Sequence, residues 1–297
     1  MRLCACEDSE QNMLKLLVPR ALPQTRPDAL PEARHGVELE YLGTAGFVLR
    51  GRGHTLVLDP YVTRVPLHKL WRQLAADEAL VSRVIPHADD VLVGHAHYDH
   101  VLDAPTLCQR TGARLIGARA VMQVGRAAGL PEHQLRETAG REEIPSGPFR
   151  VRGLPSRHGK VFMGRVLFPG DIERPPPWPP RIADLKHGLV LNWLVELGEF
   201  SLVHVDSADF VREELEGVRA DVLCLCAAGR RHRPRYVEEA VELLRPRYVV
   251  PCHWDTMVTS LERPVLLPGI DLPGMVREIE AAGAQPLLVP VLGRLRF

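Results

Sequence analysis

The chain has 297 residues, of which 45% are hydrophobic and 25% are charged, so it can fill a large core. This composition excludes a disordered, collagen-like or disulfide-scaffold protein. The 37 Lys and Arg balance 37 Asp and Glu, which removes the basic excess expected of a general nucleic-acid binder.

The six cysteines do not form a disulfide framework in a chain of this length. Cys4 and Cys6, like Cys224 and Cys226, have one residue between them, whereas zinc ribbons have two. We interpret them as reduced thiols. No apolar stretch approaches the ~20 residues that span a bilayer, and the acidic start MRLCACEDSE is unlike a signal peptide. The expected compartment is therefore the cytoplasm, with no transmembrane segment.

Prolines at four-residue intervals, from Pro19 to Pro31, exclude a regular helix or central strand from the start of the chain. Residues 1–35 are therefore predicted to be a proline-rich arm, and residues 36–297 a single domain. Short β-rich runs follow the arm, and then helices and strands alternate. The elements expected in this half are strands at 37–42, 46–50, 55–59, 90–94 and 114–118 and helices near 66–80, 104–110 and 119–128.

The second half repeats this plan. It has expected strands at 148–154, 160–168, 189–197, 200–206, 221–226, 247–252 and 286–291, and helices near 210–216, 235–244 and 273–283. A β-meander followed by β/α alternation, twice over, predicts an α/β (α+β) fold: an αββα sandwich of two mixed sheets flanked by helices. The segment ERPPPWPPR at 173–181 is expected to be an insertion loop, either a wall of a substrate cleft or a contact between protomers of a homo-oligomer.

The string GHAHYDH follows the buried strand at 90–94 and contains His95, His97, Asp99 and His100. A random H-x-H-x-D-H is expected in roughly one chain in a thousand of this composition. A loop that leaves the carboxyl end of a strand can turn the first two histidines toward one metal and the last two residues toward a second. Imidazole and carboxylate together favour Zn²⁺, with Mn²⁺ and Fe as competitors.

Three later residues are candidates to complete two metal sites, and each follows a predicted strand. They are His158 in SRHGK, Asp206 in VHVDSAD and His253 in VVPCHWD. Alone, each would more often be structural, but their order and their common position after strands favour a dinuclear site.

These motifs resemble those of the metallo-β-lactamase-fold hydrolases over residues 38–291, including YLGTAGFVLR, LVLDPY, HAHYDH, RHG, VDSAD and PCHWDT. The resemblance implies two divalent cations: one held by His95, His97 and His158, the other by Asp99, His100 and His253, with Asp206 bridging them. It also implies that Asp59 supports the histidine box from behind. Asp171, in LFPGDIE, is a competing candidate for the bridging carboxylate.

YLGTAGF and the final PCHWDT look most similar to the branch containing N-acylphosphatidylethanolamine phospholipase D and L-ascorbate-6-phosphate lactonase. This resemblance implies a hydrolase that acts on a phosphodiester, phosphate ester or lactone of a small molecule or lipid. A metal-bound hydroxide would attack the substrate, with Asp99 and His100 as catalytic residues. Arg157 is the best candidate to bind an anionic substrate. The further accessory candidates are Tyr98, Lys160, His187, Trp254 and Asp255.

Two other activities stay open on the same fold. An RNA-processing nuclease also uses H-x-H-x-D-H, and the string GRRHRPR at 229–235 could contact phosphates, although the balanced net charge disfavours a nucleic-acid partner. A mononuclear iron dioxygenase keeps the same histidine box.

Overall fold

The computed structural model describes residues 30–31 and 33–297. Most of the predicted N-terminal arm therefore lies outside the described residues. Residues 33–36 form no helix or strand, and the chain enters its first strand at Val37. The predicted domain limits at 36 and 297 stay a prediction.

The first sheet has seven strands, and its two halves differ in direction. β14, β1, β2 and β3 are antiparallel neighbours, whereas β3, β4, β5 and β6 are parallel. In sheet order, the strands are β14 (Arg294–Arg296), β1 (Val37–Gly43), β2 (Gly46–Gly51), β3 (His54–Leu58), β4 (Asp90–Val93), β5 (Arg114–Gly117) and β6 (Leu135–Glu137). The end of the chain thus completes the edge of the N-terminal sheet.

The second sheet repeats this division. β13 to β10 are parallel, and β10 to β7 are antiparallel. In sheet order, the strands are β13 (Gln285–Pro286), β12 (Tyr248–Cys252), β11 (Val222–Cys226), β10 (Phe200–Val205), β9 (Val190–Leu197), β8 (Phe149–Ser156) and β7 (Glu143–Ser146).

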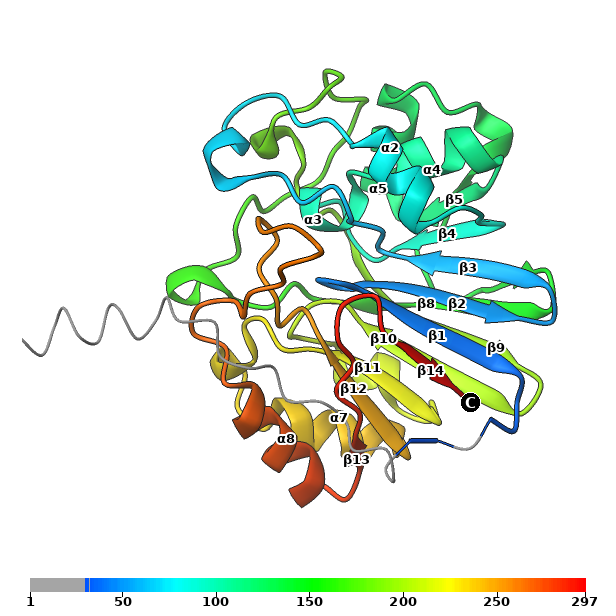
Figure 1. Ribbon diagram of the computed structural model, residues 1–297, viewed down its shortest axis with the longest axis vertical. Helices are drawn as coiled ribbons and strands as arrows, with labels where there is room; N and C mark the ends of the chain where they lie inside the picture. The colour runs from blue at the N-terminus through cyan, green and yellow to red at the C-terminus, as the bar shows by residue number, and fades with distance from the viewer. Residues whose placement is uncertain (1–29, 32) are drawn as a thin grey trace, which may run out of the picture.

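Helices cover the outer faces of the two sheets, with α2, α4 and α5 at one end of the view in Figure 1 and α7 and α8 at the other. The α-helices are α2 (Glu78–Val84), α3 (Tyr98–Val101), α4 (Ala104–Thr111), α5 (Arg119–Ala127), α6 (Arg212–Leu215), α7 (Tyr236–Leu244) and α8 (Leu272–Ala281). Short 3-10 turns occur at η2 (Leu67–Lys69), η3 (Glu132–Gln134), η4 (Phe162–Gly164), η5 (Ile182–Asp184) and η6 (Arg230–His232). The αββα sandwich is confirmed.

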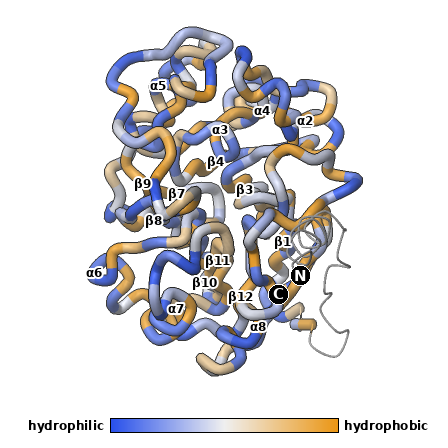
Figure 2. Tube along the Cα trace, turned by 90° about the vertical axis from the view of Figure 1, so that its left-hand side faces the viewer, coloured by the Kyte–Doolittle hydropathy of each residue, from blue (hydrophilic) through white to orange (hydrophobic). Residues whose placement is uncertain are grey.

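Alternation along the strands builds two layers of core. In β2, Phe47 and Leu49 belong to the apolar cluster between the sheets, while Val48 belongs to the cluster under the first sheet's helices. In β3, Leu58 likewise belongs to the cluster between the sheets and Val57 to the cluster under the helices. Because successive side chains of a strand point to opposite faces, apolar residues at both parities bury both faces of these strands. Figure 2 shows how apolar and polar segments alternate along the chain.

Two predicted elements are wrong. The helix expected near 66–80 is only the 3-10 turn η2, and α2 begins at Glu78, where the Asp77 side chain accepts the N–H of Leu80. The intervening chain instead bonds to the insertion loop, with the Leu74 N–H donating to the Pro180 carbonyl at 2.7 Å. The strand expected at 160–168 is a loop, because Met163 and Phe168 adopt positive φ angles that break an extended chain.

The remaining differences are smaller. The last predicted strand shortens to Gln285–Pro286, and β6, β7 and β14 were not anticipated. The predicted insertion loop at 173–181 forms no helix or strand. No helix within the described ranges is both long and apolar enough to cross a bilayer.

Candidate metal centre

The predicted ligands gather where strands of both sheets end. His95 follows β4, His158 follows β8, Asp206 follows β10 and His253 follows β12. Asp59 follows β3, and both Asp59 and His253 have positive φ, at 43° and 52°. Such backbone turns are uncommon outside glycine and concentrate at functional sites.

Gly94 allows the two sheets to approach at this point. A Cβ at this position would lie 2.7 Å from Cγ of Asp206 and 2.9 Å from the carbonyl oxygen of Leu191. Any side chain would therefore displace the carboxylate from the histidine box. The Gly94 carbonyl also accepts the N–H of Leu191 at 2.9 Å, which joins the loop to β9 of the other sheet.

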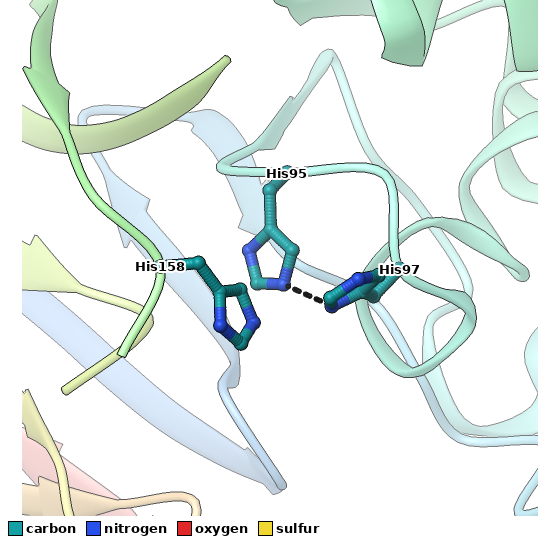
Figure 3. A group of neighbouring side chains, drawn as sticks. All are labelled: His95, His97 and His158. Atoms are coloured by element: carbon teal, nitrogen blue, oxygen red, sulfur yellow. Dashed lines mark hydrogen bonds between the residues drawn. The ribbon is translucent and has the colours of Figure 1, made fainter. Parts of the chain in front are cut away.

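His95, His97 and His158 form a first cluster, in which the candidate ligand atoms all lie within 4.8 Å of one another (Figure 3). His95 Nε2 lies 3.2 Å from His97 Nδ1. Two nitrogens bound at about 2.05 Å to one tetrahedral Zn²⁺ are about 3.3 Å apart. The observed separation therefore fits a shared cation.

The outer ring nitrogens of this cluster are oriented by backbone carbonyls. His158 Nδ1 donates to the Gly159 carbonyl at 2.7 Å, and His97 Nε2 donates to the Phe168 carbonyl at 3.4 Å. Each bond leaves the opposite nitrogen of the ring with its lone pair available. Metal-binding histidines are held in this way.

A second cluster contains Asp99, His100 and His253. Asp99 Oδ2 lies 3.3 Å from His253 Nε2 and 3.9 Å from His100 Nε2. The other nitrogen of His100, Nδ1, lies 3.0 Å from Asp59 Oδ2, while Asp59 Oδ1 accepts the N–H of Gly94 at 2.7 Å. Asp59 thus lies behind the histidine box, as the resemblance implied.

Asp206 lies between the two clusters and forms a third group with His95 and His100. Its Oδ2 is 2.6 Å from His95 Nδ1 and 3.9 Å from His100 Nδ1, while its buried Oδ1 has no partner. Asp171 is exposed, and its Oδ1 accepts the N–H of the next residue, Ile172. The structure therefore brings Asp206 to the histidines and leaves Asp171 outside. The nitrogen of His95 that faces His97 is Nε2, whereas Oδ2 of Asp206 lies beside Nδ1. The role of Asp206 as a bridge between two cations therefore stays a prediction.

Burial lowers the pKa values of the three histidines of the box. Burial and the neighbouring imidazole of His158 lower the pKa of His97 to about 4. The same causes, burial first and nearby rings second, lower the pKa values of His95 and His100 well below 6.5. A neutral imidazole has the lone pair that a metal ligand needs.

The carboxylates of the centre lack positive partners. Burial alone would raise the pKa of Asp99, but His100 and His253 outweigh it and lower that pKa. Burial and Asp206 raise the pKa of Asp59 well above its normal value. Among the described residues, the buried carboxylates of Asp59, Asp99 and Asp206 form ion-pair contacts with histidines and none with Lys or Arg. Divalent cations would supply the missing charge, so this donor set fits them.

The accessory candidates fall into three pairs. Trp254 is buried, with its ring 5.7 Å from that of Tyr41, and Asp255 forms a 2.8 Å ion pair with Arg64. The contacts of both residues are therefore structural. Arg157 and Lys160 are exposed on the loop around His158.

The other candidates lie closer to the histidine box. His187 packs against the rings of His97 and His158. Tyr98 begins α3, with its ring 5.6 Å from that of Tyr61.

The sequence analysis missed His204. It is fully buried on β10, and its Nδ1 lies 4.0 Å from Asp59 Oδ2. Its position two residues before Asp206, on the same face of the strand, was the available signal.

Comparison with known families agrees with this arrangement. Residues 38–253 match the family described as "Beta-lactamase superfamily domain". The chain belongs to the metallo-β-lactamase superfamily. The matched range begins in β1 and ends at His253, so it includes every candidate ligand.

Sequence relatives of this superfamily member include a protein of Anaeromyxobacter sp. (strain K) named "UPF0173 metal-dependent hydrolase". The identity is 29% over an alignment of 242 residues that covers 77% of this chain and 78% of the relative. A Pyrobaculum arsenaticum protein of the same name is 26% identical over an alignment of 224 residues that covers 74% of this chain and 85% of the relative.

Among solved structures, Igni18, a metallo hydrolase from Ignicoccus hospitalis, has a TM-score of 0.58 at 18% identity, covering 88% of this chain and 99% of that one. The diiron β-hydroxylase CmlA from Streptomyces venezuelae has a TM-score of 0.55 at 18% identity, covering 90% of this chain and 55% of that one. At these identities the likeness concerns the fold alone.

Proposed function

We propose that this protein is a metal-dependent hydrolase that holds two divalent cations, with Zn²⁺ favoured over Mn²⁺ and Fe. One observation carries the proposal: seven side chains of ligand type form three overlapping groups around buried carboxylates, which have no Lys or Arg partner among residues 30–31 and 33–297. Bound divalent cations would supply Lewis acidity and a nucleophile derived from water at neutral pH. The relatives named as metal-dependent hydrolases support the same reaction class.

Asp99 is the residue best placed to handle the proton of an attacking water. Burial raises its pKa, but the contacts with His100 and the hydrogen bond with His253 outweigh burial and lower it, so the carboxylate stays a hydrogen-bond acceptor at neutral pH. His100, held through Nδ1 by Asp59, keeps its Nε2 on the side of Asp99. A fixed acceptor beside a fixed imidazole orients a water without reorganisation during the reaction.

For the substrate, we propose a phosphodiester, phosphate ester or lactone of a small molecule or lipid. Two exposed cations, Arg157 and Lys160, flank His158 and would attract an anionic group. The similarity of YLGTAGF and PCHWDT to the phospholipase D and ascorbate-phosphate lactonase branch supports the same substrate classes.

The basic string at 229–235, which would contact phosphates in the nuclease alternative, forms ion pairs within the protein. Arg230 pairs with Glu278 at 2.8 Å, Arg233 with Asp209 at 2.8 Å and Arg235 with Glu238 at 2.8 Å. These guanidinium groups are partly neutralised by carboxylates, which leaves less charge for phosphates. Iron stays an alternative metal, because histidine and carboxylate ligands also suit it.

The test measures metal content and activity together. The protein is purified, analysed for zinc, manganese and iron, and assayed on a nitrophenyl phosphodiester, a nitrophenyl phosphate and a lactone. We expect about two cations per chain and hydrolysis of at least one probe. The variant His97→Ala should lose metal and activity, while His232→Ala, a histidine of η6 outside the clusters, should keep both. Wild-type protein that takes up no divalent metal would refute the proposal.

A further inference from the structure

His187 lies beside the first cluster, although the resemblance assigns it no role. Its ring is stacked on that of His158, with centroids 5.6 Å apart and planes at 27°, and it meets His97 edge-on at 5.6 Å. His95 is fully buried, whereas His158 and His187 are both partly exposed. His158 and His187 are therefore the two rings of this group that solvent reaches.

The backbone around His187 fixes it against the histidine box. The His187 carbonyl accepts the N–H of Ala96, between the two histidines of the box, at 3.0 Å. Its own N–H donates to the Phe168 carbonyl at 3.3 Å, and the next N–H, of Gly188, donates to Gly170 at 2.9 Å. One backbone hydrogen bond joins this loop to the histidine box and two join it to residues 168–170, so the position of the ring is built into the fold.

The ring of His187 is oriented in the same way as that of His158. Nδ1 of His187 donates to the carbonyl of the following glycine, Gly188, at 2.5 Å, just as His158 Nδ1 donates to Gly159 at 2.7 Å. A carbonyl can only accept, so the proton is on Nδ1 and, in the neutral ring, Nε2 has a lone pair. The difference is distance: His187 is not one of the residues whose ligand atoms converge within 4.8 Å.

We propose that His187 is a substrate-binding residue whose Nε2 accepts a hydrogen bond from the ligand at the first cluster. The site then prefers an anion that carries a hydrogen-bond donor, such as a monoprotonated phosphate monoester, over one that carries none. Exposed Lys186, the preceding residue, adds positive charge beside it. Asp171 lies near Gly188, and its Oδ1 accepts the N–H of Ile172. This inference rests on the proposed function, because it needs a loaded metal centre.

The test compares inorganic phosphate with sulfate on the zinc-loaded or cobalt-loaded full chain. At neutral pH, hydrogen phosphate carries a proton on oxygen and sulfate carries none. Binding is measured by calorimetry and by the visible spectrum of the cobalt protein. One neutral hydrogen bond corresponds to about a 2- to 12-fold difference in affinity. We expect wild type to prefer phosphate within that range and His187→Ala to lose this preference with metal content unchanged.

Two further variants separate the hydrogen bond from charge and folding. His187→Gln keeps an acceptor oxygen and should recover part of the phosphate preference. Lys186→Ala should weaken both anions by the same factor. Equal binding of the two anions by wild type, an unchanged preference in His187→Ala, or loss of metal in that variant would each overturn the inference. A wild-type chain that takes up no metal would instead refute the proposed function.

Discussion

Replacing Asp59 with Asn tests whether the histidine box depends on the carboxylate behind it. Asp59 Oδ2 is 3.0 Å from His100 Nδ1, and Oδ1 accepts the N–H of Gly94. The amide of Asp59→Asn can keep the bond to Gly94 only by turning its NH₂ toward His100. The imidazole must then carry its proton on Nε2, the nitrogen that faces Asp99, where a cation would bind.

The magnitude follows from this single contact. Loss of a group that orients a metal-binding histidine costs about 10- to 100-fold in metal affinity, or about 1.4 to 2.7 kcal/mol. We therefore expect Asp59→Asn to weaken the second cation by this factor and to leave the first cation, at His97 and His158, bound. Chelator competition gives the two affinities, and element analysis gives the stoichiometry.

Asp103→Asn is the matched control. Asp103 is equally buried and accepts backbone N–H groups of Val62 and Thr63, at 2.6 and 2.8 Å, but it is in none of the candidate ligand groups. This variant should lower the free energy of unfolding and keep both metal affinities. Equal metal affinities in the Asp59 and Asp103 variants would show that the carboxylate behind His100 does not orient it.

Four further outcomes are expected. Asp206→Ala should lose bound metal while Asp171→Ala keeps it, as measured by element analysis; the reverse result would make Asp171 the ligand. Arg157→Ala should raise KM for an anionic substrate with metal content unchanged, and an unaltered KM would remove that role. Removing the cations with a chelator should lower Tm, because free metal at a thousandfold excess over Kd stabilises the fold by about 4 kcal/mol. Burial lowers the pKa of His204 to about 4 in the folded protein, whereas the pKa in the unfolded chain is near 6.5. The unfolded chain therefore binds the proton first as the pH falls. The contribution of neutral His204 to stability is present above pH 6.5 and is lost as the pH falls toward 4. At 1.36 kcal/mol per pH unit this is roughly 3 kcal/mol at most, and urea unfolding of metal-free wild type and His204→Gln should diverge in that window.

Short β-rich apolar runs and their order along the chain were sufficient to predict most strands and the layer order. Phe47 and Val48 are both apolar yet face different layers, which is what burial of both faces of a sheet requires. The histidine box was visible because its four residues are nearly contiguous and follow a strand. Local pattern therefore found the elements and the part of the site that is local.

Pattern failed where a contact distant in the sequence decides the conformation. The segment after Pro66 has helix-forming residues, but it extends to bond to Pro180 in the insertion loop. β14 is three residues long and is a strand only because β1 lies beside it, with Leu295 opposite Leu39. No property of these segments in isolation distinguishes them from loops.

His204 was harder to place than the ligands. It lies near Asp59, which follows a strand of the other sheet, so its place in the site depends on how the sheets pack. The ligands themselves are divided in this way: the box is on the first sheet, and Asp206 and His253 are on the second. The centre is thus complete only when the sandwich is closed. Cations bound there would join the two sheets, so metal affinity and the stability of the sheet interface are thermodynamically linked.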